Sequence, residues 1–170
     1  TELENGINEV TSFVHHVDQL FSTYKEGSQV SKLRRNELTI EDADSEVIEV
    51  WKLCEQMKSL TSGAFDPWSV TEGFDPSGLV KGWAADKCAN LLTNLGIEHV
   101  LINAAGDLTV RGGELNEGDV RPWMIGISDP ENLDNVVKTY EIFDGAIATS
   151  GDYEKGAHIH DPYTGLIAIG

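Results

Sequence analysis

The first part of the chain carries a helical pattern of apolar residues. They recur every three or four positions over about five turns, at Ile7, Val10, Phe13, Val14, Val17, Leu20, Phe21 and Tyr24. Because residues three and four apart share one face of an α-helix, this spacing predicts an amphipathic helix that Gly27 ends. His15 and His16 diverge by about 100° on such a helix, so we interpret both as surface residues rather than as a shared metal site.

Two further helices are predicted downstream. Asp44 and Ser45 are typical of a helix N-terminus, and the turn at residues 61–63 ends that helix. Its inward positions are Val47, Val50, Trp51, Cys54 and Met57. A third helix runs from about Val80 to Leu95, with Gly96 as its stop. Cys54 and Cys88 fall inside helices, where buried thiols act as small apolar side chains, so we expect no disulfide between them.

Beyond Gly96 the pattern changes to short strands. Residues 100–103, 108–111, 123–128 and 136–143 are apolar runs separated by Gly, Asp, Asn and Pro. Helices come first and a mainly antiparallel sheet follows, which predicts an α+β fold in a single domain. We interpret His99, at the start of the first strand, as a structural histidine.

Composition and net charge indicate which kinds of ligand the chain is suited to bind. The chain has 170 residues, 40% hydrophobic and 24% charged, which is typical of a folded domain. Its 29 acidic and 12 basic residues give a net charge of −17, which repels nucleic acids and anionic membranes. A phosphate ligand therefore needs local devices such as loop amides, a lysine or a metal. No apolar stretch approaches the roughly 20 residues of a membrane span and no signal peptide is visible, which leaves the compartment open.

Four segments are richer in Gly, Asp, Ser and Thr than connectors need to be: 22–31, 62–81, 103–107 and 148–165. In the second of them, a glycine-containing turn leads into the third helix, so its backbone amides are expected to face an anion. Lys81 adds a point charge for a pyrophosphate, and Asp75 is an acceptor for a ribose or a flavin ring. The alternative is an ordinary helix that begins after a Gly-rich turn.

The last segment contains His158 and His160 among carboxylates and hydroxyls. An imidazole in such surroundings supplies a general base at neutral pH. A zinc site is the rival interpretation, because histidines two apart share one face of a strand. Neither a cysteine nor a third histidine accompanies them in this segment.

Taken together and in order, these segments resemble the ApbE family of FAD-dependent FMN transferases. The matching series is 21–24 with Ser28 and Ser31, then 62–66, 75–86, 102–107, 148–153 and 158–165. The resemblance covers most of the chain, from the first helix to the end. It implies an ApbE-like α+β domain over residues 1–170.

The resemblance also implies a set of functional residues. FAD is expected to contact the residues that match the family's binding positions: Tyr24, Ala64, Phe65, Asp66, Asp75 and Lys81. The backbone carbonyl of Gly78 is expected to help hold Mg²⁺ or another divalent cation. His158 matches the family's base, whereas His160 stands where an apolar residue is common.

The implied reaction is a metal-dependent phosphoryl transfer. A threonine hydroxyl of an acceptor protein attacks the FMN-side phosphorus of FAD, and AMP leaves. The expected acceptor carries an Asp-x-x-Ser/Thr-Gly-Ala-Ser/Thr segment. Two alternatives remain: a pyrophosphatase that releases FMN and AMP from FAD, and an FAD-binding module without catalysis.

Two sequence features of the family are not found in this chain. Family members carry a downstream helix whose Asp and Thr, four residues apart, ligate the metal, and a Met-Gly-Thr strand ahead of the first helix. We therefore expect a domain trimmed at both ends. The family is often extracytoplasmic and membrane-anchored in bacteria, and no signal or anchor is visible here.

Overall fold

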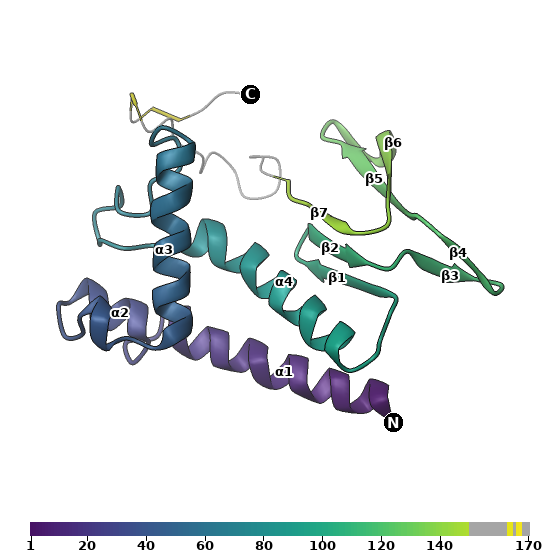
Figure 1. The fold of residues 1–170 in the computed structure, drawn as a ribbon. Coiled ribbons are helices and arrows are strands. Elements are labelled where there is room, and N and C mark those ends of the chain that lie inside the picture. The colour runs from purple at the N-terminus through teal and green to yellow at the C-terminus, as the bar shows by residue number, and fades with distance from the viewer. Residues whose placement is uncertain (150–162, 165, 168–170) are drawn as a thin grey trace.

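The computed structural model of the protein describes residues 1–149, 163–164 and 166–167 (Figure 1). Its helices are α1 (Glu2–Phe21), α2 (Gln29–Arg34), η1 (Ile40–Asp42, a 3₁₀ turn), α3 (Ser45–Leu60) and α4 (Ser77–Asn94). The three helices predicted from apolar spacing are α1, α3 and α4, and all three are confirmed.

The helix starts follow local capping chemistry. Thr1 and Glu4 form a capping box on α1, and the Asp44 carboxylate accepts the Glu46 amide at 3.0 Å to cap α3. Helix α4 begins at Ser77, earlier than predicted, because the Pro76 carbonyl already accepts helical hydrogen bonds. The loop expected over 22–31 is shorter, since α2 begins within it.

The strands form three small antiparallel sheets, which confirms the α+β fold. Strands β1 (Val100–Ala104), β2 (Asp107–Arg111) and β7 (Gly145–Ile147) make one sheet in the order β1-β2-β7. The two hairpins are β3 (Glu114–Asn116) with β4 (Asp119–Arg121), and β5 (Trp123–Asp129) with β6 (Asn132–Ile142). The four predicted strands correspond to β1, β2, β5 and β6, while β3, β4 and β7 were not predicted.

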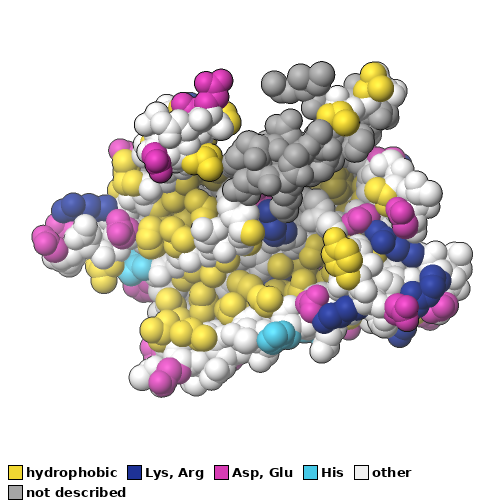
Figure 2. Space-filling view, turned by 180° about the vertical axis from the view of Figure 1, so that it is seen from behind, with side chains coloured by type: hydrophobic (Ala, Val, Ile, Leu, Met, Phe, Trp, Pro, Cys, Tyr) yellow, Lys and Arg dark blue, Asp and Glu magenta, His cyan; other side chains and the backbone are white. Residues whose placement is uncertain are grey.

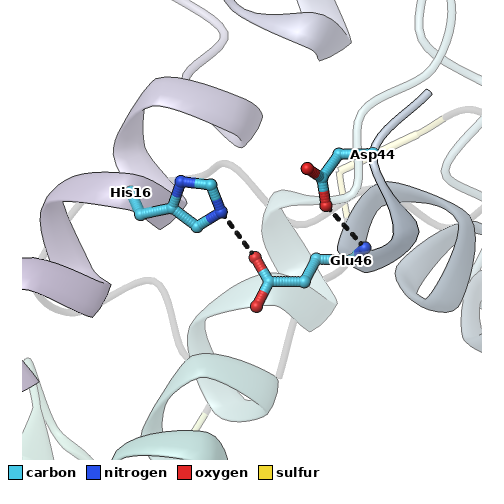
Figure 3. Close-up of side chains that lie close together, drawn as sticks. All are labelled: His16, Asp44 and Glu46. Carbon is cyan, nitrogen blue, oxygen red and sulfur yellow. Dashed lines mark hydrogen bonds and ion pairs between the residues drawn. The ribbon is translucent and has the colours of Figure 1, made fainter.

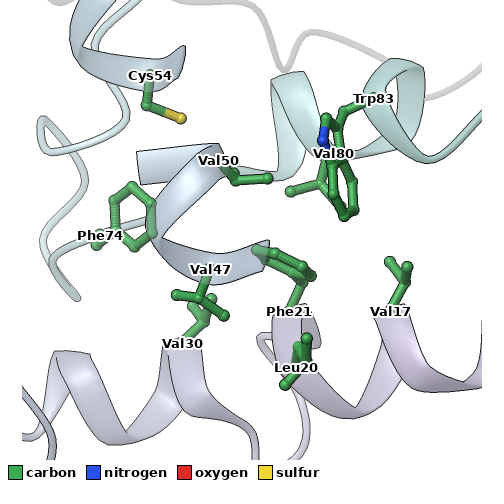
Figure 4. Close-up of a cluster of buried hydrophobic side chains, with 10 residues drawn as sticks. All are labelled: Val17, Leu20, Phe21, Val30, Val47, Val50, Cys54, Phe74, Val80 and Trp83. Atoms are coloured by element: carbon green, nitrogen blue, oxygen red, sulfur yellow. The ribbon is translucent and has the colours of Figure 1, made fainter. Parts of the chain in front are cut away.

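The main core lies where α1, α2, α3 and α4 meet (Figure 4). Its side chains are Val17, Leu20, Phe21, Val30, Val47, Val50, Cys54, Phe74, Val80 and Trp83. The Trp83 ring meets Phe21 edge-on at 5.5 Å between centroids, and its indole N–H donates to Glu49 at 3.1 Å. Aromatic packing and a satisfied polar edge fix α4 against its neighbours.

Helix α4 connects the helical core with the sheet, because it packs against α1 and also against β1 and β2 (Figure 1). Close approach to α1 occurs at buried Gly6, where an added Cβ atom would lie 2.8 Å from Leu92 Cδ2. Asp86 pairs with Arg111 at 3.2 Å and ties α4 to β2. The C-terminal half of α4 is thereby fixed against α1 and β2.

Two interpretations of single residues are confirmed. Cys54 and Cys88 are buried free thiols, and burial raises the pKa of Cys54 to about 12. The His99 Nδ1 atom lies 2.9 Å from the Gly112 carbonyl oxygen, as expected of a structural histidine. Gly112 has φ +70°, and an added Cβ atom would lie 1.9 Å from the Glu98 carbonyl oxygen, so glycine is required there.

Figure 2 shows apolar side chains spread over one face of the molecule. A groove of about 300 Å³ between α1 and β1 is lined by Leu3, Ile7, Val10, Thr11, Leu92, Ile97, His99, Val100, Leu101 and Ile102. Within the described ranges, no helix combines the length and the apolar character needed to cross a membrane.

Candidate functional site

The candidate site is built around the start of α4, where Asp75 precedes the first turn. One carboxylate oxygen of Asp75 accepts the Ser77 amide at 3.0 Å, and the other lies 3.0 Å from Arg34 Nη2. Arg34 also donates from Nε to the Phe74 carbonyl at 2.8 Å. The last residue of α2 therefore fixes both the carboxylate and the backbone ahead of α4.

The protonation state of Asp75 follows from these contacts. Burial is the largest single influence and by itself raises the pKa of Asp75. The hydrogen bonds from Ser77 and the charge of Arg34 outweigh burial together, so the pKa of Asp75 lies below its ordinary value. Asp75 is thus a carboxylate at neutral pH and acts as a hydrogen-bond acceptor.

Asp66 occupies a second acidic position on the adjoining loop. Its carboxylate accepts the Trp68 amide at 3.0 Å and lies 2.8 Å from Lys58 Nζ at the end of α3. The hydrogen bond from Lys58 is the main reason that the pKa of Asp66 is lowered. The loop is joined to the start of α4 by the Asp75 amide, which donates to the Pro67 carbonyl at 2.7 Å.

Phe65 and Gly78 are in contact. A Cβ atom added at Gly78 would lie 3.2 Å from Phe65 Cε2, so glycine lets the ring approach the first turn of α4. Gly78 is exposed and lies inside the helix rather than in the loop ahead of it. Ala64 is exposed beside them, and its amide donates to the Thr61 carbonyl at 3.1 Å.

Lys81 links the first turns of α4 to the sheet. Its ammonium group lies 2.8 Å from the Asp107 carboxylate at the start of β2. Asp107 is 18% exposed and also accepts the Thr149 amide at 3.2 Å. Residues 62–81, 103–107 and the beginning of 148–165 therefore meet at one place, although they are far apart in sequence.

Of the remaining predicted site residues, Tyr24 lies in the described part of the chain and the two histidines of the last segment lie outside it. Tyr24 is 96% exposed, and its amide donates to the Ser22 hydroxyl at 3.3 Å. His158 and His160 lie outside the described residues, so the role of the first and the rival zinc interpretation both stay predictions.

A surface pocket of about 660 Å³ adjoins Asp66. It is lined by Trp51, Glu55, Lys58, Ser59, Ser62, Gly63 and Trp68. The Trp51 and Trp68 rings meet edge-on at 5.0 Å between centroids, and the Lys58 ammonium lies 5.5 Å from the centroid of Trp68. Lys58 thus belongs both to the pocket and to the ion pair with Asp66.

The sequence did not predict that Arg34, Lys58 and the two pocket tryptophans, Trp51 and Trp68, belong to the site. Arg34 lies on α2, whose six residues are too short for a periodic pattern. Lys58 stands in the last turn of α3, where a basic residue is ordinary. Trp51 packs against the core as expected, with its ring centroid 4.5 Å from that of Phe74, and its indole N–H also donates to Glu55 beside the pocket at 3.2 Å.

The described residues give only part of a metal site near Gly78. A divalent cation takes about six oxygen ligands or more, and the one predicted here is the backbone carbonyl of Gly78. The carboxylates of Asp75 and Asp107 belong to the same region but pair with Arg34 and Lys81. Further oxygen ligands would have to complete such a site.

Relatives of known name match part of the chain. A Vibrio cholerae protein named FAD:protein FMN transferase is 38% identical over 100 residues, which cover 54% of this chain and 29% of the relative. A Treponema pallidum protein of the same name is 33% identical over 110 residues, covering 55% of this chain and 30% of the relative. The matched region therefore spans less than a third of these relatives.

Solved structures match almost the whole chain. The ApbE protein of Thermotoga maritima aligns with a TM-score of 0.84 at 25% identity, covering 98% of this chain and 71% of that one. The flavin transferase ApbE of Vibrio cholerae gives a TM-score of 0.78 at 25% identity, with 98% and 70% covered. The ApbE family model matches residues 2–72 and 69–168. With sequence and fold in agreement over nearly its full length, the chain belongs to the ApbE family.

Proposed function

We propose that the chain is the FAD-binding part of a metal-dependent FMN transferase. The enzyme would move FMN from FAD onto a threonine hydroxyl of an acceptor protein and release AMP. The observation that carries this proposal is the meeting of Phe65, Asp66, Asp75, Gly78 and Lys81 at one end of α4. The names of the relatives from Vibrio cholerae and Treponema pallidum support the same activity.

The start of α4 suits a pyrophosphate. An α-helix of 18 residues carries partial positive charge at its N-terminus, which favours an anion. Lys81 lies within the first turns and provides a full positive charge once the anion competes with Asp107 for it. In a chain of net charge −17, such local features are needed to hold a dianionic ligand.

The aromatic pocket suits a planar ring. Ligand pockets commonly measure about 300–1,000 Å³ and combine apolar walls with a few polar groups, and the pocket beside Asp66 has that size and composition. Trp51 and Trp68 form its wall, while Asp66 and Lys58 stand at its edge. We assign this pocket to one of the two ring systems of FAD.

The transfer step exchanges a phosphoanhydride bond for a phosphate ester bond. The threonine oxygen forms a bond to the FMN-side phosphorus, the bond to the bridging pyrophosphate oxygen breaks, and AMP leaves with that oxygen. His158 would take the proton of the attacking hydroxyl. A divalent cation, when bound, neutralises charge on the phosphates, and the Gly78 carbonyl would be among its ligands.

Two assays separate the transferase from its alternatives. A chain that includes the expected downstream metal-ligand helix is incubated with FAD and Mg²⁺, with and without an acceptor protein that carries the expected threonine segment. A transferase yields AMP together with covalent flavin fluorescence on the acceptor. A pyrophosphatase yields AMP and free FMN without an acceptor, and a binding module yields neither product while still quenching flavin fluorescence.

The placement of FAD is tested by removing the two carboxylates. Asp66→Ala combined with Asp75→Ala is expected to weaken FAD binding about 10-fold or more, because each residue offers a charged hydrogen-bond acceptor. The matched control is Glu41→Ala with Glu72→Ala, which removes the same charge from two exposed residues outside the site. If both double variants bound FAD with equal affinity in a fluorescence titration, this placement of FAD would be wrong.

A further inference from the structure

A second cluster of potential ligands lies away from the flavin site. His16 on α1 meets Asp44 and Glu46 at the start of α3, and Figure 3 shows the three side chains converging. One ligand atom from each residue lies within 4.8 Å of the other two. In the part of the chain that the structure describes, no other group of three His, Cys, Asp or Glu side chains comes as close.

The Glu46 carboxylate has an oxygen without a hydrogen bond. Its Oε2 atom is buried and accepts none from the described residues, although His16 Nε2 lies 2.9 Å away. The distance is that of an ion pair, which Figure 3 marks with a dashed line. A metal ion shared with His16 would supply the partner that this buried oxygen needs.

The spacing of the two atoms agrees with ligation of one metal ion. Imidazole nitrogen and carboxylate oxygen lie about 2.0–2.2 Å from Zn²⁺. Two such ligands are then about 2.8–3.0 Å apart at octahedral angles and about 3.3–3.5 Å apart at tetrahedral angles. The separation between His16 Nε2 and Glu46 Oε2 is 2.9 Å, so these two atoms need little movement to share a metal.

Asp44 is held in place as a third ligand. One of its carboxylate oxygens accepts the Glu46 amide at 3.0 Å, and its own amide donates to Gln29 Oε1 at 2.8 Å. Such contacts orient a carboxylate in the way that outer hydrogen bonds orient metal ligands. The start of α3 repels a cation with about half a unit charge, but the two carboxylates supply two negative charges.

We propose that His16, Asp44 and Glu46 form a binding site for a divalent transition-metal ion, with Zn²⁺ as the representative. One neutral imidazole and two carboxylates balance the charge of such an ion. Imidazole favours Zn²⁺ and related metals over Mg²⁺ or Ca²⁺, and three protein ligands leave a position for water. The ion would tie α1 to α3 independently of the flavin site.

The proposal is tested by titrating the chain with ZnCl₂ in a calorimeter. The chain has five histidines, so binding alone does not locate the site, and variants are needed. Loss of a residue that only orients a metal ligand costs roughly 10- to 100-fold in metal affinity. His16→Ala and Glu46→Gln each remove a ligand itself, so each should weaken zinc binding by more than this. His15→Ala is the matched control, because it removes the neighbouring imidazole on the same helix.

Thermal unfolding provides a second readout. Zinc should raise the Tm of the parent chain and of His15→Ala, but not that of His16→Ala or Glu46→Gln. Circular dichroism confirms that each variant is folded; Glu46→Gln keeps the size of the side chain should His16→Ala unfold. Zinc that leaves the parent Tm unchanged, or that binds His16→Ala as tightly as the parent, overturns the proposal.

Discussion

At the candidate flavin site around the start of α4, Asp66, Asp75 and Lys81 each form an ion pair with a residue of opposite charge. Asp75 pairs with Arg34, Asp66 pairs with Lys58, and Lys81 reaches the carboxylate at the start of β2. Two of the pairs join elements that are distant in sequence, and the pair of Asp66 with Lys58 joins a loop to the helix just before it. A ligand that binds here has to share or exchange these partners, so the pairs hold the site in shape before FAD arrives.

The Asp75 pair predicts a specific dependence of stability on pH. The pKa of Asp75 is lower in the folded chain than its ordinary value, about 3.9 in an unfolded chain. Its contribution is therefore fully present above about pH 4 and is lost as pH falls through the folded pKa. Asp75→Asn should lower the free energy of unfolding at pH 7 by about 1–2 kcal/mol, measured by urea denaturation.

The difference between Asp75→Asn and the parent should shrink as the pH falls through the lowered pKa of Asp75 in the folded chain, because the parent carboxylate then takes up a proton. Glu72→Gln, which changes an exposed carboxylate three residues upstream, serves as the control and should stay close to the parent throughout. A deficit of Asp75→Asn that is constant from pH 7 to pH 2 would show that its charge is not the stabilising feature.

Elements with long apolar patterns were predictable, and short ones were not. The period of α1 and the capping residue Asp44 of α3 are sufficient signals, because each arises from neighbours in sequence. Helix α2 has six residues and strand β7 has three, so neither shows a periodic pattern in the sequence. Tertiary contacts decide whether such short segments form a helix or a strand. The order of the sequence motifs predicted that Asp66 and Asp75 lie in one region. Their partners, Arg34 on α2 and Lys58 on α3, become apparent only once the helices are packed together.

Two helical glycines make opposite predictions about packing. Gly6 in α1 faces Leu92 and Ile97, and an added Cβ atom would lie 2.8 Å and 3.0 Å from their terminal carbons. Gly6→Leu should therefore destabilise the chain by about 1–3 kcal/mol through overpacking. Gly82 in α4 is exposed, with no atom of the described chain within 4 Å of an added Cβ atom.

Gly82→Ala should stabilise the chain by about 0.5–1 kcal/mol, because alanine favours the helix and restricts the unfolded chain. Chemical denaturation of both variants measures the two effects against one parent. A Gly6→Leu variant as stable as the parent would mean that α1 and α4 are not packed as closely as described.

At the scale of the whole molecule, the sheet brings the start of the last loop to the flavin site. Strand β7 pairs with β2, and the Thr149 amide then donates to Asp107, the partner of Lys81. The segment that carries His158 thus begins beside the positive charge assigned to the pyrophosphate. This arrangement supports a reaction in which the base comes from residues 148–165 and the phosphate is held by α4.

His158 is therefore predicted to be the general base. In a chain that includes the expected downstream metal-ligand helix, His158→Ala should reduce FMN transfer by about 100-fold to 10,000-fold, the usual contribution of such a base. FAD affinity should change little, because the residue acts on the acceptor hydroxyl rather than on the flavin. Covalent flavin on an acceptor protein, measured at saturating FAD, gives the rate.

His160→Ile is the matched control, since it removes a second imidazole from the same segment and restores an apolar residue of the kind common in the family. We expect His160→Ile to transfer FMN at close to the parent rate. If the segment needed any imidazole, or if the two histidines bound zinc together, both variants would lose activity alike. Transfer by His158→Ala near the parent rate, or loss in His160→Ile alone, would show that the base has been assigned to the wrong residue.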